Sequence, residues 1–205
     1  VNSGSEANEL ALRLVRAATG ARRMLVQDHA YHGNTVAAID LSPYKFDGPG
    51  GAGKPDWVEV ISVADPYRGR FAGNPQCGAL HAAEVDEAVT RLSERGEKLA
   101  GFIAESFPSV GGQIIPPDNY LAEIYRRVRA AGGLCIADEV QTGLGRLGAH
   151  YWGFEQQATV PDVVVVGKPL GNGHPIGAVV TTSEIAASFA NGMEFFSTFG
   201  GSTLS

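Results

Sequence analysis

The chain has 205 residues, enough for one substantial α/β domain whose core folds without disulfides or metals. Its composition, 44% hydrophobic and 19% charged, is that of a globular protein. Sixteen basic against 22 acidic residues give a net charge of −6, and no run of Lys and Arg occurs. This balance argues against nucleic acid or an anionic membrane as the main partner.

The chain carries two cysteines, Cys77 and Cys135, and Cys135 sits in an apolar run. This usage indicates a reduced protein, and with no signal peptide and no membrane-length apolar stretch we expect it in the cytoplasm. We expect no metal, because no His, Cys or Asp cluster has ligand spacing. The chain starts on Val1 and stops in a Gly/Ser/Thr loop, so we expect an excerpt of a longer protein.

Helices and strands alternate along the chain. Apolar periodicity and glycine stops predict helices over 6–19, 84–96 and 118–133, the last capped by Asp118. Short apolar runs predict strands over 24–26, 57–63, 101–104, 134–137 and 163–166. Residues 43–55 are rich in Gly and Pro and predict a loop. Continuous apolar strands between helices predict an α/β fold with a mostly parallel sheet covered on both faces.

Chemically active side chains follow four of these strands: Tyr31, Glu105, Asp138 and Lys168. Ligands of open α/β sheets bind outside the carboxyl ends of the strands, so these residues predict one shared site. An anion site adds to it, because Gly4 and Ser5 open a helix whose first amides are unpaired. The Ser3-x-x-Glu6 spacing also fits a capping box, which is the simpler structural explanation.

Residues 143–148 fit G-x-G-x-x-G literally. The dinucleotide fingerprint needs a helix to begin within this motif, and the following residues have poor helical patterning. Asp162 has roughly the spacing of a ribose-binding acid, but it precedes a strand. We therefore interpret the motif as a turn and keep nucleotide binding as a weak alternative.

Lys168 directly follows the apolar run 163–166 and Gly167, so we expect its amine in a partly desolvated pocket. A lone lysine at a strand end more often reaches solvent. The functional alternative is a reactive amine suited to forming a Schiff base.

The motifs Ser3-Gly-Ser-Glu-Ala-Asn8, Tyr31-His-Gly33, Asp138-Glu-Val-Gln-Thr-Gly143 and Gly167-Lys168 occur in this order. Together they resemble the class III aminotransferases, which are pyridoxal-phosphate enzymes of fold type I. The resemblance implies that Lys168 forms the Schiff base and moves the proton between substrate carbon and cofactor. It implies that Asp138 pairs with the pyridine nitrogen and keeps the ring an electron sink.

The same resemblance implies the other contacts of the cofactor. Val140 lies under its ring, Tyr31 stacks on the other face, and Gln141 lies near the phenolic oxygen. Gly4 and Ser5 hold the phosphate.

Ser197 and Thr198 match a segment that reaches the phosphate of the neighbouring subunit, which implies a homodimer with shared sites. Glu105 matches a structural acid near the pocket, a weaker assignment. Glu139 we interpret as a salt-bridge partner rather than a reactant. The histidines at 29, 32 and 174 we interpret as hydrogen-bonding turn residues.

Members of this family have an N-terminal segment and a C-terminal small domain, and residues 1–205 correspond to the large, cofactor-binding domain between them. The expected reaction is transfer of an amino group from an amine or amino acid to a 2-oxo acid. The segments 42–46, 67–69, 104–106, 111–117 and 167–175 instead resemble a branch with ethanolamine-phosphate phospho-lyase, which eliminates phosphate, and with alanine–glyoxylate aminotransferase-like enzymes. A third hypothesis is an inactive fragment that acts only in subunit association.

Overall fold

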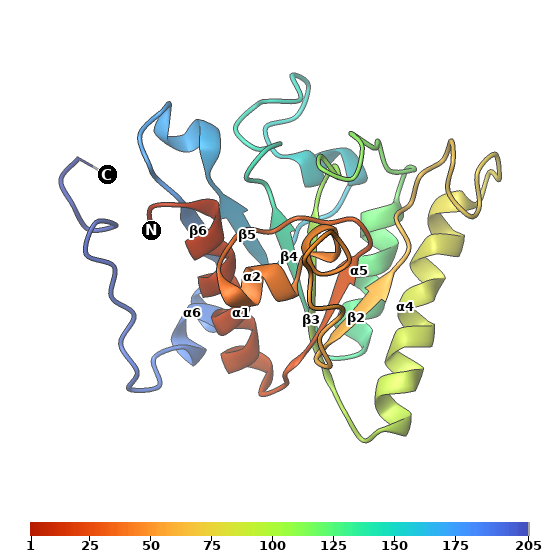
Figure 1. Cartoon of the computed structure of the whole chain (residues 1–205), viewed down its shortest axis with the longest axis horizontal. Helices are drawn as coiled ribbons and strands as arrows, with labels where there is room; N and C mark the ends of the chain where they lie inside the picture. The colour runs from red at the N-terminus through yellow and green to blue at the C-terminus, as the bar shows by residue number, and fades with distance from the viewer. Residues whose placement is uncertain (205) are drawn as a thin grey trace.

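The computed structural model describes residues 1–204, which form one six-stranded sheet with helices on both faces (Figure 1). The strand order is β2-β1-β3-β4-β5-β6. All neighbours pair in parallel except β5 and β6, which are antiparallel. The strands are β1 (Arg23–Gln27), β2 (Val58–Ile61), β3 (Leu99–Glu105), β4 (Leu134–Asp138), β5 (Val163–Val166) and β6 (Ala178–Thr181). The prediction of a mostly parallel α/β sheet is confirmed.

Long helices cover the sheet. The helices are α1 (Gly4–Thr19), α2 (Val36–Asp40), α3 (Pro43–Phe46), α4 (Cys77–Glu94), α5 (Tyr120–Ala130) and α6 (Ser183–Ser188). Two 3-10 turns, η1 (Gly153–Gln157) and η2 (Lys168–Gly171), flank β5. Helices α4 and α5 pack side by side at the right of Figure 1, and α1 packs against α6 and the strands β5 and β6.

The central strands are buried on both faces, because successive side chains point to opposite sides of a sheet. On the α1 side, Val26, Ile103 and Ile136 join one apolar cluster. On the α4 and α5 side, Phe102 and Cys135 join another. This two-sided burial explains why the strands read as unbroken apolar runs.

Two helix starts differ from the expectation. Helix α4 begins at Cys77, seven residues before the predicted start, because Gly78 and the buried His81 face the protein there. Helix α5 is preceded by Asn119 in the left-handed region, with φ of 63° and no side-chain cap. The predicted cap by Asp118 is therefore wrong. For α1 the cap is confirmed, since the Ser3 hydroxyl accepts the Glu6 amide at 3.1 Å.

Four short elements of the structure were not predicted from the sequence: α2, α3, β6 and α6. Helix α3 lies inside the predicted 43–55 loop, and only four residues form it. Strand β6 lies at the sheet edge and is at most half-buried, and its apolar run is only three residues long. Within residues 1–204, no helix combines the length and apolar character needed to span a bilayer.

Asp162 ties β5 to β4. Its carboxylate accepts the amide of Cys135 at 2.8 Å, and its own amide donates to the Cys135 carbonyl at 2.9 Å. Arg129 of α5 pairs with the same carboxylate at 3.1 Å. Asp162 is thus a structural link between two strands. Its carboxylate is occupied by these contacts, which argues against the alternative in which it binds the ribose of a nucleotide.

Candidate active site

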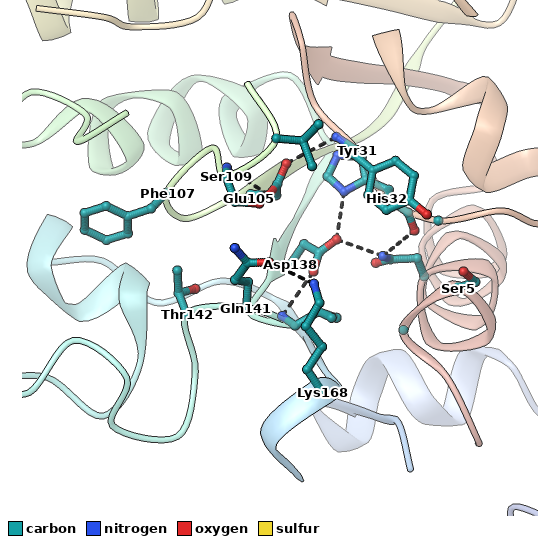
Figure 2. Close-up of a pocket in the computed structure, with 15 residues that line it drawn as sticks. Ser5, Tyr31, His32, Glu105, Phe107, Ser109, Asp138, Gln141, Thr142 and Lys168 are labelled. Atoms are coloured by element: carbon teal, nitrogen blue, oxygen red, sulfur yellow. Dashed lines mark hydrogen bonds and ion pairs between the residues drawn. The ribbon is translucent and has the colours of Figure 1, made fainter. Parts of the chain in front are cut away.

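A cavity of about 240 Å³ lies at the carboxyl ends of β1, β3, β4 and β5, against the first turn of α1 (Figure 2). It collects eight of the ten residues proposed from the sequence: Gly4, Ser5, Tyr31, Glu105, Asp138, Val140, Gln141 and Lys168. These residues come from segments far apart in the chain. Their convergence follows from the parallel order of the strands, which brings all the carboxyl ends to one edge.

Asp138 ends β4 and is 5% exposed. Its Oδ2 accepts from the Asn8 side-chain amide at 2.8 Å and lies 2.8 Å from His32 Nδ1. Its Oδ1 accepts the Val140 amide at 3.1 Å. These contacts fix the carboxylate at the cavity wall (Figure 2), where it can bind a protonated ring nitrogen.

His32 and Asn8 were not assigned to the site from the sequence, yet both line the cavity and hold Asp138. His32 is 2% exposed and its amide donates to Ser42 Oγ at 2.8 Å. Because an ionised carboxylate only accepts, we assign the proton to Nδ1 of His32. No spacing rule links His32 to Asp138, which lie 106 residues apart, so no sequence signal pointed to the contact.

Lys168 follows β5 and Gly167 as the first residue of η2, with a φ of 35°. Its Nζ donates to Gln141 Oε1 at 2.9 Å. The Lys168 side chain is exposed at the cavity rim, so the expectation of a desolvated lysine is wrong. Burial ends at Gly167, and Lys168 is the first residue beyond the sheet edge.

Val140 packs between two glycines that reach the cavity from different segments. A Cβ on Gly4 would lie 3.0 Å from a methyl of Val140, and one on Gly167 would lie 3.2 Å from the other methyl. A side chain at either position would therefore require Val140 to shift by a few tenths of an ångström. The contact brings together the first turn of α1, the end of β4 and the segment that carries Gly167 and Lys168.

The first turn of α1 supplies an anion cradle. Ser3 accepts the amides of Glu6 and Ala7, which leaves the amides of Gly4 and Ser5 at the cavity. The positive end of a 16-residue helix dipole adds to their attraction for an anion.

Tyr31 is fixed through its backbone and its ring. Glu105 Oε1 accepts the Tyr31 amide at 3.2 Å, and its Oε2 accepts the Ser109 amide at 3.1 Å. The Tyr31 ring meets Tyr44 edge-on at 6.1 Å, and Lys45 Nζ lies 5.6 Å from the Tyr31 ring centroid. Glu105 thus joins two loops of the cavity wall, which fits the structural role expected for it.

Glu139 has a different role from the one expected. It is 0% exposed and makes no ion pair within the described chain. Its carboxylate accepts the hydroxyls of Ser106 and Thr142 and the amides of Gly153 and Phe154. The residue is therefore a buried acceptor that holds η1 against β4, and the salt-bridge interpretation is wrong.

Ser197 and Thr198 lie outside this cavity. They line a separate one of about 370 Å³ between α1 and the C-terminal segment, with Glu6 and Arg13. The chain's own cavity is therefore formed without them, and their assignment to a neighbouring subunit stays a prediction.

The turn over residues 143–148 carries no helix, which agrees with setting nucleotide binding aside. A model of the family described as aminotransferase class-III matches residues 1–205. The chain belongs to the class III aminotransferases.

Two curated relatives within this family share much of the sequence. The alanine–glyoxylate aminotransferase 2-like protein of Drosophila melanogaster is 52% identical, over 100% of this chain and 42% of the relative. The ethanolamine-phosphate phospho-lyase homolog 1 of Caenorhabditis elegans is 42% identical, over 98% of this chain and 45% of the relative. The chain therefore spans less than half the length of these class III relatives.

Solved structures of both reaction types have the same fold. A phospholyase from Arthrobacter in complex with phosphoethanolamine superposes with a TM-score of 0.86 and 40% identity, over 97% of this chain and 46% of that one. An omega transaminase from Pseudomonas jessenii in complex with PMP superposes with a TM-score of 0.84 and 26% identity, over 93% of this chain and 44% of that one. Fold alone therefore does not choose between the two reactions in this family.

Proposed function

We propose that this chain is the cofactor-binding large domain of a pyridoxal-phosphate-dependent aminotransferase that moves an amino group from an amine or amino acid to a 2-oxo acid. One observation carries the proposal: the Lys168 amine and the Asp138 carboxylate line one cavity closed by a helix N-terminus. A covalent anchor, a partner for a ring nitrogen and a phosphate cradle are the three attachments that such a cofactor needs.

The residues fit the cofactor in shape and in polarity. Val140 packs closely against Gly4 and Gly167 and lines the cavity, so it offers an apolar surface to a flat ring. On the two residues that hold Asp138, two further buried atoms, His32 Nε2 and Asn8 Oδ1, have no hydrogen-bond partner within residues 1–204. A polar ligand is a natural source of partners near such groups.

Each residue then has a task of its own. Lys168 would hold the cofactor covalently and move the proton at the substrate carbon. Asp138, held by His32 and Asn8, would keep a proton on the ring nitrogen. Tyr31 and Val140 would enclose the ring. When bound, pyridoxal phosphate supplies an electron sink for the pair left on the deprotonated carbon.

Gln141 already accepts a hydrogen bond from the Lys168 amine, so it would orient that amine next to the cofactor's phenolic oxygen. Gly4 and Ser5 would bind the phosphate. We also propose a homodimer in which Ser197 and Thr198 reach the partner's site, which their position outside the chain's own cavity supports.

Borohydride reduction of the full-length protein loaded with pyridoxal phosphate tests the assignment. We expect the label on Lys168 by mass spectrometry and its loss in Lys168→Ala. The exposed Lys98, at the opposite end of β3, is the matched control, and Lys98→Ala keeps the label. Equal labelling of wild type and Lys168→Ala would overturn the proposal.

The second candidate is elimination of phosphate from a phosphorylated amino alcohol. It is favoured by the phosphoethanolamine complex of the Arthrobacter phospholyase, at 40% identity against 26% for the transaminase structure. Both reactions begin with loss of the same proton to Lys168. Supplying phosphoethanolamine without a 2-oxo acid separates them: phosphate release supports elimination, whereas strict dependence on the oxo acid supports transamination.

A further inference from the structure

A second cavity, of about 620 Å³, opens on the other side of Lys168. It shares Phe107, Ser109, Gln141, Thr142 and Lys168 with the first cavity. In the view of Figure 2, Ser5 lies at one end of the site and Phe107 at the other, with Asp138 between them. The amine therefore stands where the cavity assigned to the cofactor meets a space large enough for a small substrate.

The second cavity has a different charge from the first. Arg146 and Lys168 line it, and no Asp or Glu is among its lining residues. The carboxylates Glu105 and Asp138 line only the first cavity. A negatively charged group is therefore favoured on the Arg146 side of the amine.

The turn that fitted G-x-G-x-x-G fixes the position of Arg146. Leu144, Gly145 and Gly148 have φ values of 62°, 77° and 78°. The Gly145 amide donates to the Tyr151 carbonyl at 2.9 Å, and the Gly148 amide donates to the Gly145 carbonyl at 3.0 Å. The motif thus shapes a closed turn with an arginine near its tip.

The Arg146 guanidinium makes no ion pair and no hydrogen bond within the described part of the chain. Its neighbours in the cavity lining include the apolar side chains of Phe107, Ile115 and Leu147. The arginine is exposed, so an anion can reach its guanidinium from solvent. A guanidinium also binds both oxygens of a phosphate or carboxylate at once.

We propose that this second cavity is the substrate subsite and that Arg146 binds an anionic substituent, phosphate or carboxylate, on the substrate whose amino group reaches Lys168. The inference rests on the proposed function, because it needs Lys168 to be the reacting amine. It adds a specificity residue from the 143–148 turn, to which neither the sequence motifs nor the family resemblance gave a role.

Binding to the full-length protein, loaded with cofactor and reduced with borohydride, tests the subsite without relying on turnover. Ethyl phosphate and propanoate, which lack an amine, are titrated by calorimetry. We expect Arg146→Ala to weaken binding of at least one of them about 10- to 100-fold, the value of a charged hydrogen bond. Arg146→Lys recovers part of the affinity. Arg22→Ala, at an exposed arginine outside both cavities, keeps it.

The two anions identify the group that is bound. A loss for ethyl phosphate alone assigns the subsite to phosphorylated amines, and a loss for propanoate as well extends it to amino acids. Equal affinity of wild type and Arg146→Ala for both anions would overturn the subsite. If the anions behave as expected while borohydride fails to label Lys168, Arg146 is an anion-binding residue, but the proposed function fails and the substrate role of the cavity fails with it.

Discussion

Replacing Glu139 by alanine is expected to destabilise the protein strongly without touching the substrate or cofactor. The carboxylate is 0% exposed and accepts the amides of Gly153 and Phe154 at 2.8 and 3.0 Å. It also accepts the hydroxyls of Ser106 and Thr142. Glu139→Ala leaves two backbone donors buried without an acceptor, whereas the two hydroxyls can rotate toward others.

Each unsatisfied amide costs about 1–3 kcal/mol, so the free energy of unfolding falls by about 2–6 kcal/mol. At about 1–2 °C per kcal/mol for a protein about twice as long as this chain, the melting temperature falls by roughly 4–8 °C for a change near 4 kcal/mol. Glu139→Gln keeps one acceptor oxygen and loses about half as much.

Differential scanning calorimetry of the full-length protein gives the melting temperatures. Glu87→Ala, at an exposed glutamate of α4, is the control and changes stability by less than about 0.5 kcal/mol. A Glu139→Ala protein within about 1 kcal/mol of the wild type would refute the reasoning from buried acceptors.

Three further predictions follow from the contacts. His32→Leu removes a donor to Asp138 and weakens pyridoxal-phosphate binding about 10- to 100-fold in fluorescence titrations, because one charged hydrogen bond contributes about 1.5–3 kcal/mol; unchanged affinity contradicts it. Gly4→Ala crowds Val140 and lowers cofactor affinity, and adding Val140→Ala restores part of it; additive losses would exclude the steric cause. Burial raises the pKa of Glu84, but hydrogen bonds from His81 and Ser62 outweigh this and lower its pKa from 4.5 to about 2. Because its folded-state pKa is depressed, Glu84 stabilises the fold above about pH 4.5 and loses this effect as the pH falls toward 2. The melting temperature of Glu84→Gln should therefore fall less between about pH 4.5 and pH 2 than that of the wild type.

The sequence was most informative where one physical rule dominates. Unbroken apolar runs located β4 and β5, because strands buried on both faces have no polar positions. Residues just beyond those runs then had to meet at one sheet edge, which is why Asp138 and Lys168 were found. The short edge strand β6 was not predicted: its apolar run is only three residues long, and Val180 within it is exposed.

The contacts that hold the site together were beyond sequence reasoning. Asn8 and Asp138 are separated by 130 residues, and only the packing of α1 on the sheet joins them. The four donors to Glu139 belong to residues 106, 142, 153 and 154, so no local pattern distinguishes this buried acceptor from a salt-bridge partner. Such networks depend on tertiary geometry and leave no periodicity in the chain.

The contacts of Asp162 help to determine the register in which β5 pairs with β4. Residues 163–166 are four identical valines, so side-chain shape gives β5 no means to distinguish one register from the next. A slip by one residue would move Lys168 by about 3.3 Å and turn it to the other face, away from Asp138. The Asp162 bonds to Cys135 and Arg129 penalise that slip. The accuracy of the site therefore depends on a carboxylate at the far end of the strand, and variants of Asp162 should yield misaligned protein that is folded but unable to hold the cofactor.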